Sequence, residues 1–112
     1  MNPIKPTNFI GRNRFEGKSV LVTGGAAGMG LAAARMFAAE GARVSVIDIQ
    51  EEAGQAFVKE IESTGGQAVF ETANLADPGQ TSQALENVIK NVGVIDTLFN
   101  HAGTIIVKPF HE

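Results

Sequence analysis

The chain contains no cysteine and only two histidines among its 112 residues. Without cysteine it forms no disulfide framework, thiol nucleophile or thiolate metal site. The histidines, His101 and His111, have no carboxylate partners at ligand spacing, so we expect no metal site. The chain also lacks an apolar run of membrane-spanning length, and its basic first residues lack the apolar stretch of a signal peptide. We therefore expect a cytoplasmic protein without a membrane partner.

Charge is unevenly distributed, which bears on domain organisation and partners. The first 18 residues carry four basic groups against one acidic group, whereas the remaining 94 carry five basic and eleven acidic groups. An acidic folded part argues against a nucleic-acid partner. The length allows at most one domain. We expect a flexible basic arm at residues 1–14, a folded unit at residues 15–103 and a tail at residues 104–112.

The most informative motif is the glycine-rich stretch Thr23-Gly24-Gly25-Ala26-Ala27-Gly28-Met29-Gly30. It follows an apolar, strand-like run, Ser19 to Val22, and leads into an alanine-rich, helix-like run, Leu31 to Ala39. Such a turn aims unpaired backbone N–H groups and the positive end of a helix dipole at one point. Glycine lets the ligand and the crossing helix approach closely. This arrangement predicts a pyrophosphate-binding turn.

Strands and helices are expected to alternate through the rest of the chain. The expected strands after the first are 44–49, 68–75 and 94–99, and the expected further helices are 51–63 and a segment from Asp77 to Val92. Asp77 can cap the last helix, with Gln80 closing a capping box. Alternation of this kind predicts right-handed crossovers and a parallel α/β sheet. We infer a Rossmann-like fold with four strands in the order 3-2-1-4 and three helices, with the loops after the strands along one edge.

Several motifs in order give the chain a family resemblance. The segment from Phe15 to Gly25 resembles the opening of the short-chain dehydrogenases/reductases, and the glycine spacing is similar to that family's T-G-x-x-x-G-x-G. Asn100-His101-Ala102-Gly103 resembles the family's N-N-A-G element, with His101 in place of the second asparagine. Asn74-Leu75 stands where the family usually carries an aspartate and an aliphatic residue. The resemblance runs from about Phe15 to Gly103.

The resemblance and the predicted edge together imply a dinucleotide site. Its expected residues are Gly24, Gly28 and Gly30 under the pyrophosphate, Met29 near the nicotinamide-side ribose, Asp48 at the adenosine ribose, Asn74 and Leu75 beside adenine, and Asn100, Ala102 and Gly103 along the cleft. The cofactor is expected to be NAD in preference to NADP. A 2′-phosphate beside the Asp48 carboxylate would meet like charge, and Ala26, Ala27 and Ile49 supply no cation.

The family's chemistry uses a serine and a Y-x-x-x-K pair farther along than N-N-A-G, and this chain contains no tyrosine. The resemblance therefore implies no catalytic residue here, and we expect a truncated chain that is inactive alone. The apolar fourth strand is expected to form an open edge that self-associates or pairs with a missing C-terminal half. A non-catalytic nucleotide-binding or interaction module is the alternative. A methyltransferase-like Rossmann domain would suit Asp48 but fits the glycine spacing poorly.

Overall fold

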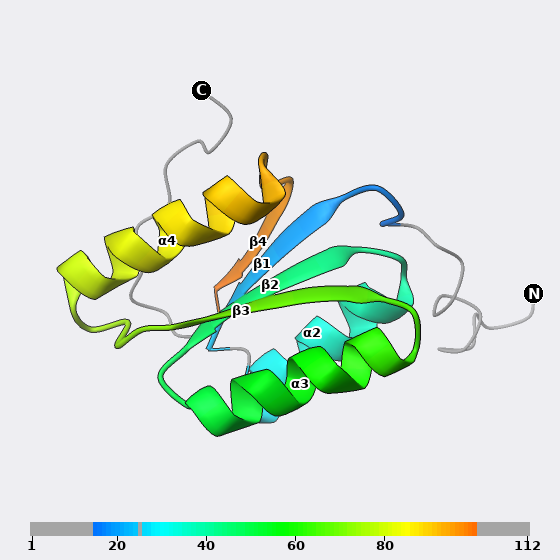
Figure 1. Ribbon diagram of the computed structural model, residues 1–112, viewed down its shortest axis with the longest axis horizontal. Helices are drawn as coiled ribbons and strands as arrows, with labels where there is room; N and C mark the ends of the chain where they lie inside the picture. The colour runs from blue at the N-terminus through cyan, green and yellow to red at the C-terminus, as the bar shows by residue number, and fades with distance from the viewer. Residues whose placement is uncertain (1–14, 25, 101–112) are drawn as a thin grey trace, which may run out of the picture.

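The structure is a computed structural model that describes residues 15–24 and 26–100. Strands and helices alternate along the described chain, as the sequence predicts (Figure 1). The strands are β1 (Ser19–Thr23), β2 (Arg43–Asp48), β3 (Gln67–Thr72) and β4 (Thr97–Asn100). The helices are α2 (Gly28–Ala39), α3 (Glu51–Ser63) and α4 (Pro78–Val92).

The four strands form one parallel sheet in the order β3-β2-β1-β4. This confirms the predicted Rossmann-like fold with its strand order and three helices. In the register of the sheet, Val22 of β1 lies opposite Val46 of β2 on one side and Phe99 of β4 on the other. Because all strands run the same way, their carboxyl ends lie at one edge.

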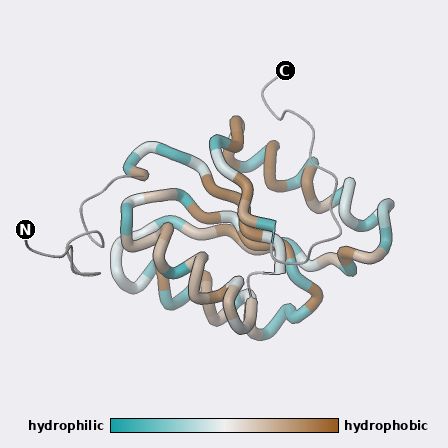
Figure 2. Tube along the Cα trace, turned by 180° about the vertical axis from the view of Figure 1, so that it is seen from behind, coloured by the Kyte–Doolittle hydropathy of each residue, from teal (hydrophilic) through white to brown (hydrophobic). Residues whose placement is uncertain are grey.

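Helices cover both faces of the sheet: α2 and α3 lie on one face and α4 on the other (Figure 1). Alternate residues of β1 pack against the helices on opposite faces of the sheet, because successive side chains of a strand point to opposite faces. Val20 and Val22 join the cluster that includes Phe57 of α3, whereas Leu21 joins the cluster that includes Val88 of α4. The apolar strands form the middle of the molecule (Figure 2). β1 is buried over its whole length.

The ends of several elements differ from the sequence prediction. β3 ends at Thr72 instead of residue 75, because its partner β2 ends at Asp48, the residue opposite Thr72. β4 begins at Thr97 instead of residue 94, because the N–H of Ser19 is already bound by the Asp96 side chain at 2.8 Å. α2 begins at Gly28, so the last glycines of the motif belong to its first turn.

The predicted capping box at α4 is only half formed. Oδ1 of Asp77 accepts the N–H groups of Gly79 at 2.9 Å and Gln80 at 3.2 Å, which confirms the cap. The reciprocal bond is absent, because the N–H of Asp77 donates to the carbonyl of Asn74. The Gln80 oxygen instead accepts the N–H of Asn74 at 2.9 Å. The side chain of Gln80 thus fixes the turn before α4.

Candidate functional site

The carboxyl edge of the sheet brings together the predicted site residues that the structure describes. Asp48 and Asn100 are the last residues of β2 and β4, and Gly24 directly follows β1. Gly28, Met29 and Gly30 open α2, and Asn74 and Leu75 lie in the turn after β3. The predicted site residues Ala102 and Gly103 lie outside the described residues, as do the arm and the tail.

The glycine-rich turn has the backbone geometry that its sequence indicates. Gly24 and Gly28 adopt φ angles of 71° and 58°, a region that favours glycine. The N–H of Gly24 donates to the carbonyl of Ile47 at 2.8 Å, which fixes the start of the turn against β2. Apart from its chain neighbours and the backbone of its own helix, a Cβ at Gly28 would meet no heavy atom of the described residues within 4 Å. Among these residues, the space beside Gly28 is therefore open to a ligand.

The N-terminus of α2 differs from those of the other described helices. Asp77 caps α4, and Glu51 and Glu52 place negative charge in the first turn of α3. At α2 the described residues give neither: the N-cap is Ala27, no side chain caps it and the first turn holds no acidic residue. Among the described residues, α2 and its N-cap thus supply no side chain that neutralises the positive end of the helix dipole at the carboxyl edge. An anion is the ligand that such an end favours.

Asp48 is almost fully buried, with 6% of its surface exposed, and makes two hydrogen bonds to backbone. Oδ2 accepts the N–H of Ala26 in the glycine-rich turn at 3.0 Å, and Oδ1 accepts the N–H of Gln50 at 2.9 Å. The sequence placed this carboxylate at the edge but gave no sign of its bond to the turn. Its neighbour Ile49 is exposed.

Thr23 links the ends of two adjacent strands at the same edge. Its hydroxyl, fully buried, donates to Oδ1 of Asn100 at 2.7 Å. Our sequence reasoning assigned Asn100 to the cleft and gave Thr23 no role. The first letter of the T-G-x-x-x-G-x-G pattern was the signal that could have found it.

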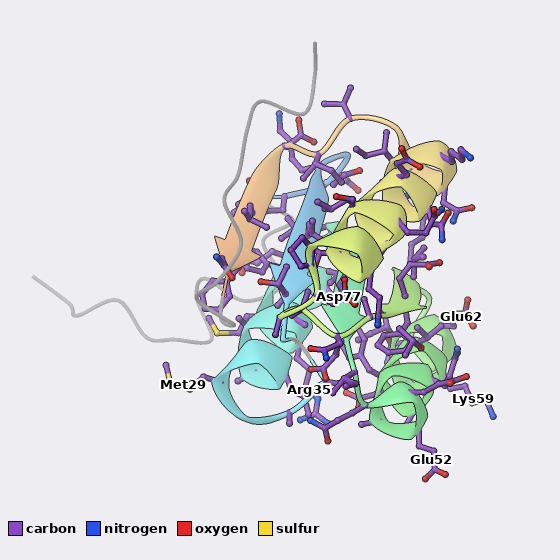
Figure 3. The ribbon with its side chains drawn as sticks, turned by 90° about the vertical axis from the view of Figure 1, so that its left-hand side faces the viewer. Met29, Arg35, Glu52, Lys59, Glu62 and Asp77 are labelled. Atoms are coloured by element: carbon purple, nitrogen blue, oxygen red, sulfur yellow. The ribbon has the colours of Figure 1, made fainter. Side chains whose placement is uncertain are left out.

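The other predicted site residues that the structure describes are Asn74, Leu75 and Met29. Oδ1 of Asn74 accepts the N–H of Ala76 at 3.0 Å, so the amide closes a turn of its own. Leu75 is half-buried and packs against the α4-side cluster. Met29 is 71% exposed and projects from the first turn of α2 (Figure 3).

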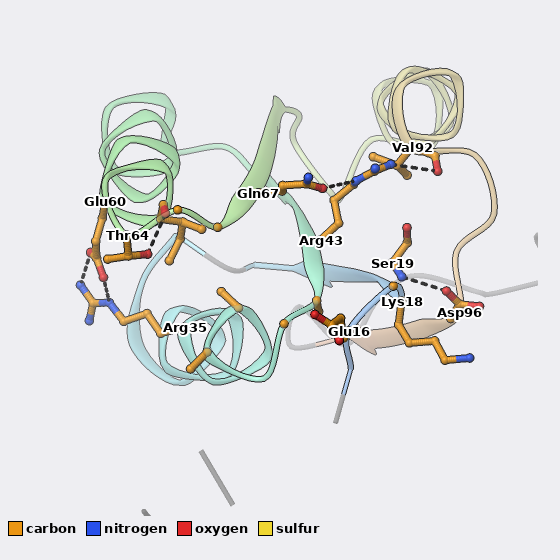
Figure 4. Close-up of a pocket in the computed structure, with 18 of the residues that line it drawn as sticks. Glu16, Lys18, Ser19, Arg35, Arg43, Glu60, Thr64, Gln67, Val92 and Asp96 are labelled. Carbon is orange, nitrogen blue, oxygen red and sulfur yellow. Dashed lines mark hydrogen bonds and ion pairs between the residues drawn. The ribbon is translucent and has the colours of Figure 1, made fainter. Parts of the chain in front are cut away.

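A groove of about 1110 Å³ lies at the opposite, amino-terminal edge of the sheet (Figure 4). Its charged side chains include both signs and are largely engaged. Arg35 and Glu60 form a two-bond ion pair, which lowers the pKa of Glu60 and raises that of Arg35. Arg43 donates to Gln67 and to the carbonyl of Val92. The groove is thus separated by the length of β1 from the edge that carries the glycine-rich turn.

Residues 15–24 and 26–100 hold no group of three or more histidine, aspartate or glutamate side chains placed to bind a metal ion. Nor does any helix within these ranges have the length and apolar character needed to span a bilayer.

Comparison with known proteins identifies the family. The model of the short chain dehydrogenase family matches residues 18–112. The chain is 40% identical to the 2,5-dichloro-2,5-cyclohexadiene-1,4-diol dehydrogenase LinX of Sphingobium indicum over 100 residues, which cover 89% of this chain and 40% of that protein. It thus spans about two fifths of the length of this relative.

Solved structures of dehydrogenases and reductases are also similar to this chain. The hydroxysteroid dehydrogenase of Escherichia coli superposes with a TM-score of 0.75 at 34% identity, over 80% of this chain and 38% of that one. The F189W actinorhodin polyketide ketoreductase, whose structure is with NADPH, gives 0.71 at 31% identity, over 75% and 32%. The order of strands, the glycine-rich turn and these likenesses agree: the chain belongs to the short-chain dehydrogenase/reductase family of oxidoreductases.

Proposed function

We propose that residues 15–103 are the NAD-binding part of a short-chain dehydrogenase/reductase that transfers hydride between NAD(H) and an alcohol or ketone. The observation that carries this proposal is the N-terminus of α2, which has neither a capping side chain nor a first-turn acid among the described residues and faces the same edge as Asp48. The open space beside Gly28 fits a diphosphate approaching this backbone.

The described residues would share the work of holding the cofactor. Backbone N–H groups around Gly28 and Gly30 would bind the diphosphate, with Gly24 shaping the turn and Met29 beside the nicotinamide-side ribose. Asp48 would accept from the adenosine ribose. Asn74 and Leu75 would flank adenine; Oδ1 of Asn74 has one lone pair engaged by Ala76 and one left for the adenine amine. Asn100, with Ala102 and Gly103, would line the cleft.

The preference for NAD over NADP rests on local charge. The ketoreductase structure contains NADPH, so the fold itself accommodates a 2′-phosphate. In this chain Asp48, with its carboxylate, is the last residue of β2. No positive charge is supplied by the nearby residues Ala26, Ala27 and Ile49. A phosphate placed there would meet repulsion that costs several kcal/mol.

Chemistry requires more than a bound cofactor. The 112 residues contain no tyrosine, so they hold no Y-x-x-x-K pair to pass a proton to the substrate oxygen. We propose that they bind NAD without turning over substrate, and that the outer edge of β4 pairs with further strands of the same protein or of another copy. The second candidate is a non-catalytic nucleotide-binding module of the same fold.

Titration calorimetry of the purified chain with NAD and NADP tests the proposal. We expect NAD to bind more tightly, and Ala27→Asp to weaken NAD at least about tenfold by filling the α2 N-terminus with charge. Ala56→Asp, on the exposed surface of α3, adds the same charge elsewhere and should leave binding unchanged. Failure of NAD to bind, or equal loss in both variants, contradicts the proposal.

An assay with NADH and a panel of ketones tests the chemistry. We expect no turnover by the 112 residues. Measurable turnover would overturn the claim that they lack the catalytic groups. A downstream in-frame Y-x-x-x-K in the coding sequence would favour the dehydrogenase over the non-catalytic module.

A further inference from the structure

Asp48 contacts the glycine-rich turn directly, and this contact suggests a second role for it. Its Oδ2 accepts the N–H of Ala26 at 3.0 Å while Oδ1 accepts that of Gln50 at 2.9 Å. We propose that Asp48 is a positioning residue that holds the turn in the shape that binds a diphosphate, in addition to any contact with ribose. The proposal rests on the proposed cofactor function and deepens it.

The described residues of the turn have few other fixed points. Gly24 at its start is bonded to the carbonyl of Ile47. Ala27 at its end has extended backbone with φ −153° and no side-chain cap, and its carbonyl accepts the N–H of Leu31. Glycine-rich backbone has many conformations available, so an unanchored turn would sample shapes in which its N–H groups diverge. The bond from Ala26 is charge-assisted and nearly excluded from water, which makes it a strong restraint.

Both anchors belong to the end of β2, since Ile47 and Asp48 are its last residues. The neighbouring strand therefore holds the turn after β1 at both Gly24 and Ala26. Ala26 itself is buried, with 3% of its surface exposed, so its N–H is not available to the ligand and serves the fold.

Holding the turn does not prevent Asp48 from binding ribose. An ionised carboxylate offers about four lone-pair sites, and the structure engages two of them. A ribose hydroxyl can donate to a remaining site while the bond to Ala26 persists. One carboxylate would thus set the ribose contact and the diphosphate contact together, and replacing it would weaken ligands that have no ribose hydroxyl at all.

The decisive comparison is between ADP and 2′,3′-dideoxy-ADP, which keeps the diphosphate and adenine but lacks both hydroxyls. We expect Asp48→Ala to weaken dideoxy-ADP by about tenfold, and ADP by more. Asp48→Asn keeps one acceptor oxygen and should fall between the wild type and Asp48→Ala. The matched control is Asp96→Ala, because Asp96 also accepts a backbone N–H, that of Ser19, but at the opposite edge. It should change neither affinity.

The overturning result is an Asp48→Ala chain that loses affinity for ADP and keeps wild-type affinity for dideoxy-ADP, because Asp48 would then act through the hydroxyls alone. An equal loss in Asp96→Ala would also overturn the proposal, as the effect would be general destabilisation.

A second readout needs no ligand. Amide hydrogen exchange at Ala26 should accelerate at least about tenfold in Asp48→Ala, relative to exchange at Gly24, whose N–H donates to the carbonyl of Ile47. Unchanged exchange at Ala26 counts against the anchoring role. If the wild type binds no nucleotide, the proposed function fails, while the exchange measurement still decides whether Asp48 holds the turn.

Discussion

The hydroxyl of Thr23 donates a 2.7 Å hydrogen bond to the side-chain oxygen of Asn100 and so joins the last residues of β1 and β4. Thr23 is fully buried, so water cannot replace the bond when it is lost. We expect Thr23→Val to lower the free energy of unfolding by about 1 to 2 kcal/mol in a urea titration. Thr23→Ser keeps the donor and should lose less. A loss in Thr23→Ser with none in Thr23→Val would show that the methyl group, not the hydroxyl, matters.

Replacing Asp48 should narrow the preference between cofactors. Asp48→Ala removes the carboxylate that would repel a 2′-phosphate, and it also removes the anchor of Ala26. The ratio of NAD to NADP affinity should fall by about tenfold or more, mainly through weaker NAD binding. Calorimetry with both cofactors measures the ratio. A wild-type chain with equal affinity for both would refute the assignment of Asp48 as the discriminating residue.

α3 packs closely against the sheet at Gly54. A Cβ at this position would overlap the ring of Phe70 in β3. Although alanine is the better helix former, we expect Gly54→Ala to destabilise the fold by about 1 to 3 kcal/mol through overpacking. In the Phe70→Leu background the same substitution should cost less, because the smaller side chain leaves room. Additive losses in a denaturant double-mutant cycle would contradict this explanation.

Ser45 carries a polar group that has no evident use. Its Oγ is buried in β2 and has no hydrogen-bond partner among the described residues. Removing an unsatisfied hydroxyl should cost nothing, so Ser45→Ala is expected to leave stability unchanged or to raise it by about 1 kcal/mol. Thermal and urea unfolding would measure this. A marked loss of stability would mean that the hydroxyl has a partner.

The ion pair of Arg35 and Glu60 gives a small pH-dependent contribution to stability. The hydrogen bond from Arg35 is the main cause that holds the pKa of Glu60 below its ordinary value of 4.5. A carboxylate with a lowered folded-state pKa stabilises the fold above its unfolded pKa and loses that contribution as the pH falls through the folded one. The stability difference between the wild type and Glu60→Gln should therefore shrink below pH 4.5.

Both side chains of this pair are substantially exposed, so the difference should also shrink with added salt. The measurement is urea unfolding across a pH series at low and high salt. A difference that persists unchanged in acid would rule out the ion pair as its source.

Local signals explain why some elements were predicted closely. The helix expected at residues 51–63 is observed as Glu51–Ser63, because the glycine pair Gly65-Gly66 stops it and its apolar stripe faces the sheet. The end of β3 was wrong because it depends on where β2 stops, a fact about another segment. Gln80 was misassigned for a similar reason: its oxygen is claimed by Asn74.

In the candidate site too, local sequence signals predicted some features, while others depend on a distant segment. Strand order and the glycine-rich turn placed Gly28, Asp48 and Asn100 at one edge, as the structure has them. The bond from Ala26 to Asp48 could not be predicted, because it depends on the path of the turn in space. The roles of these residues toward a cofactor stay predictions.

The contacts at the two ends of β1 have a consequence for the order in which the fold is completed. Asp96 binds the N–H of Ser19 and Asn100 binds the hydroxyl of Thr23, each across 77 residues of chain. Closing so long a loop is entropically costly, and pairings of high sequence separation form slowly. On a ribosome β1 is made first and β4 last among the described strands. The side of β1 that pairs with β4 therefore stays unpaired until nearly all of the described chain has been synthesised.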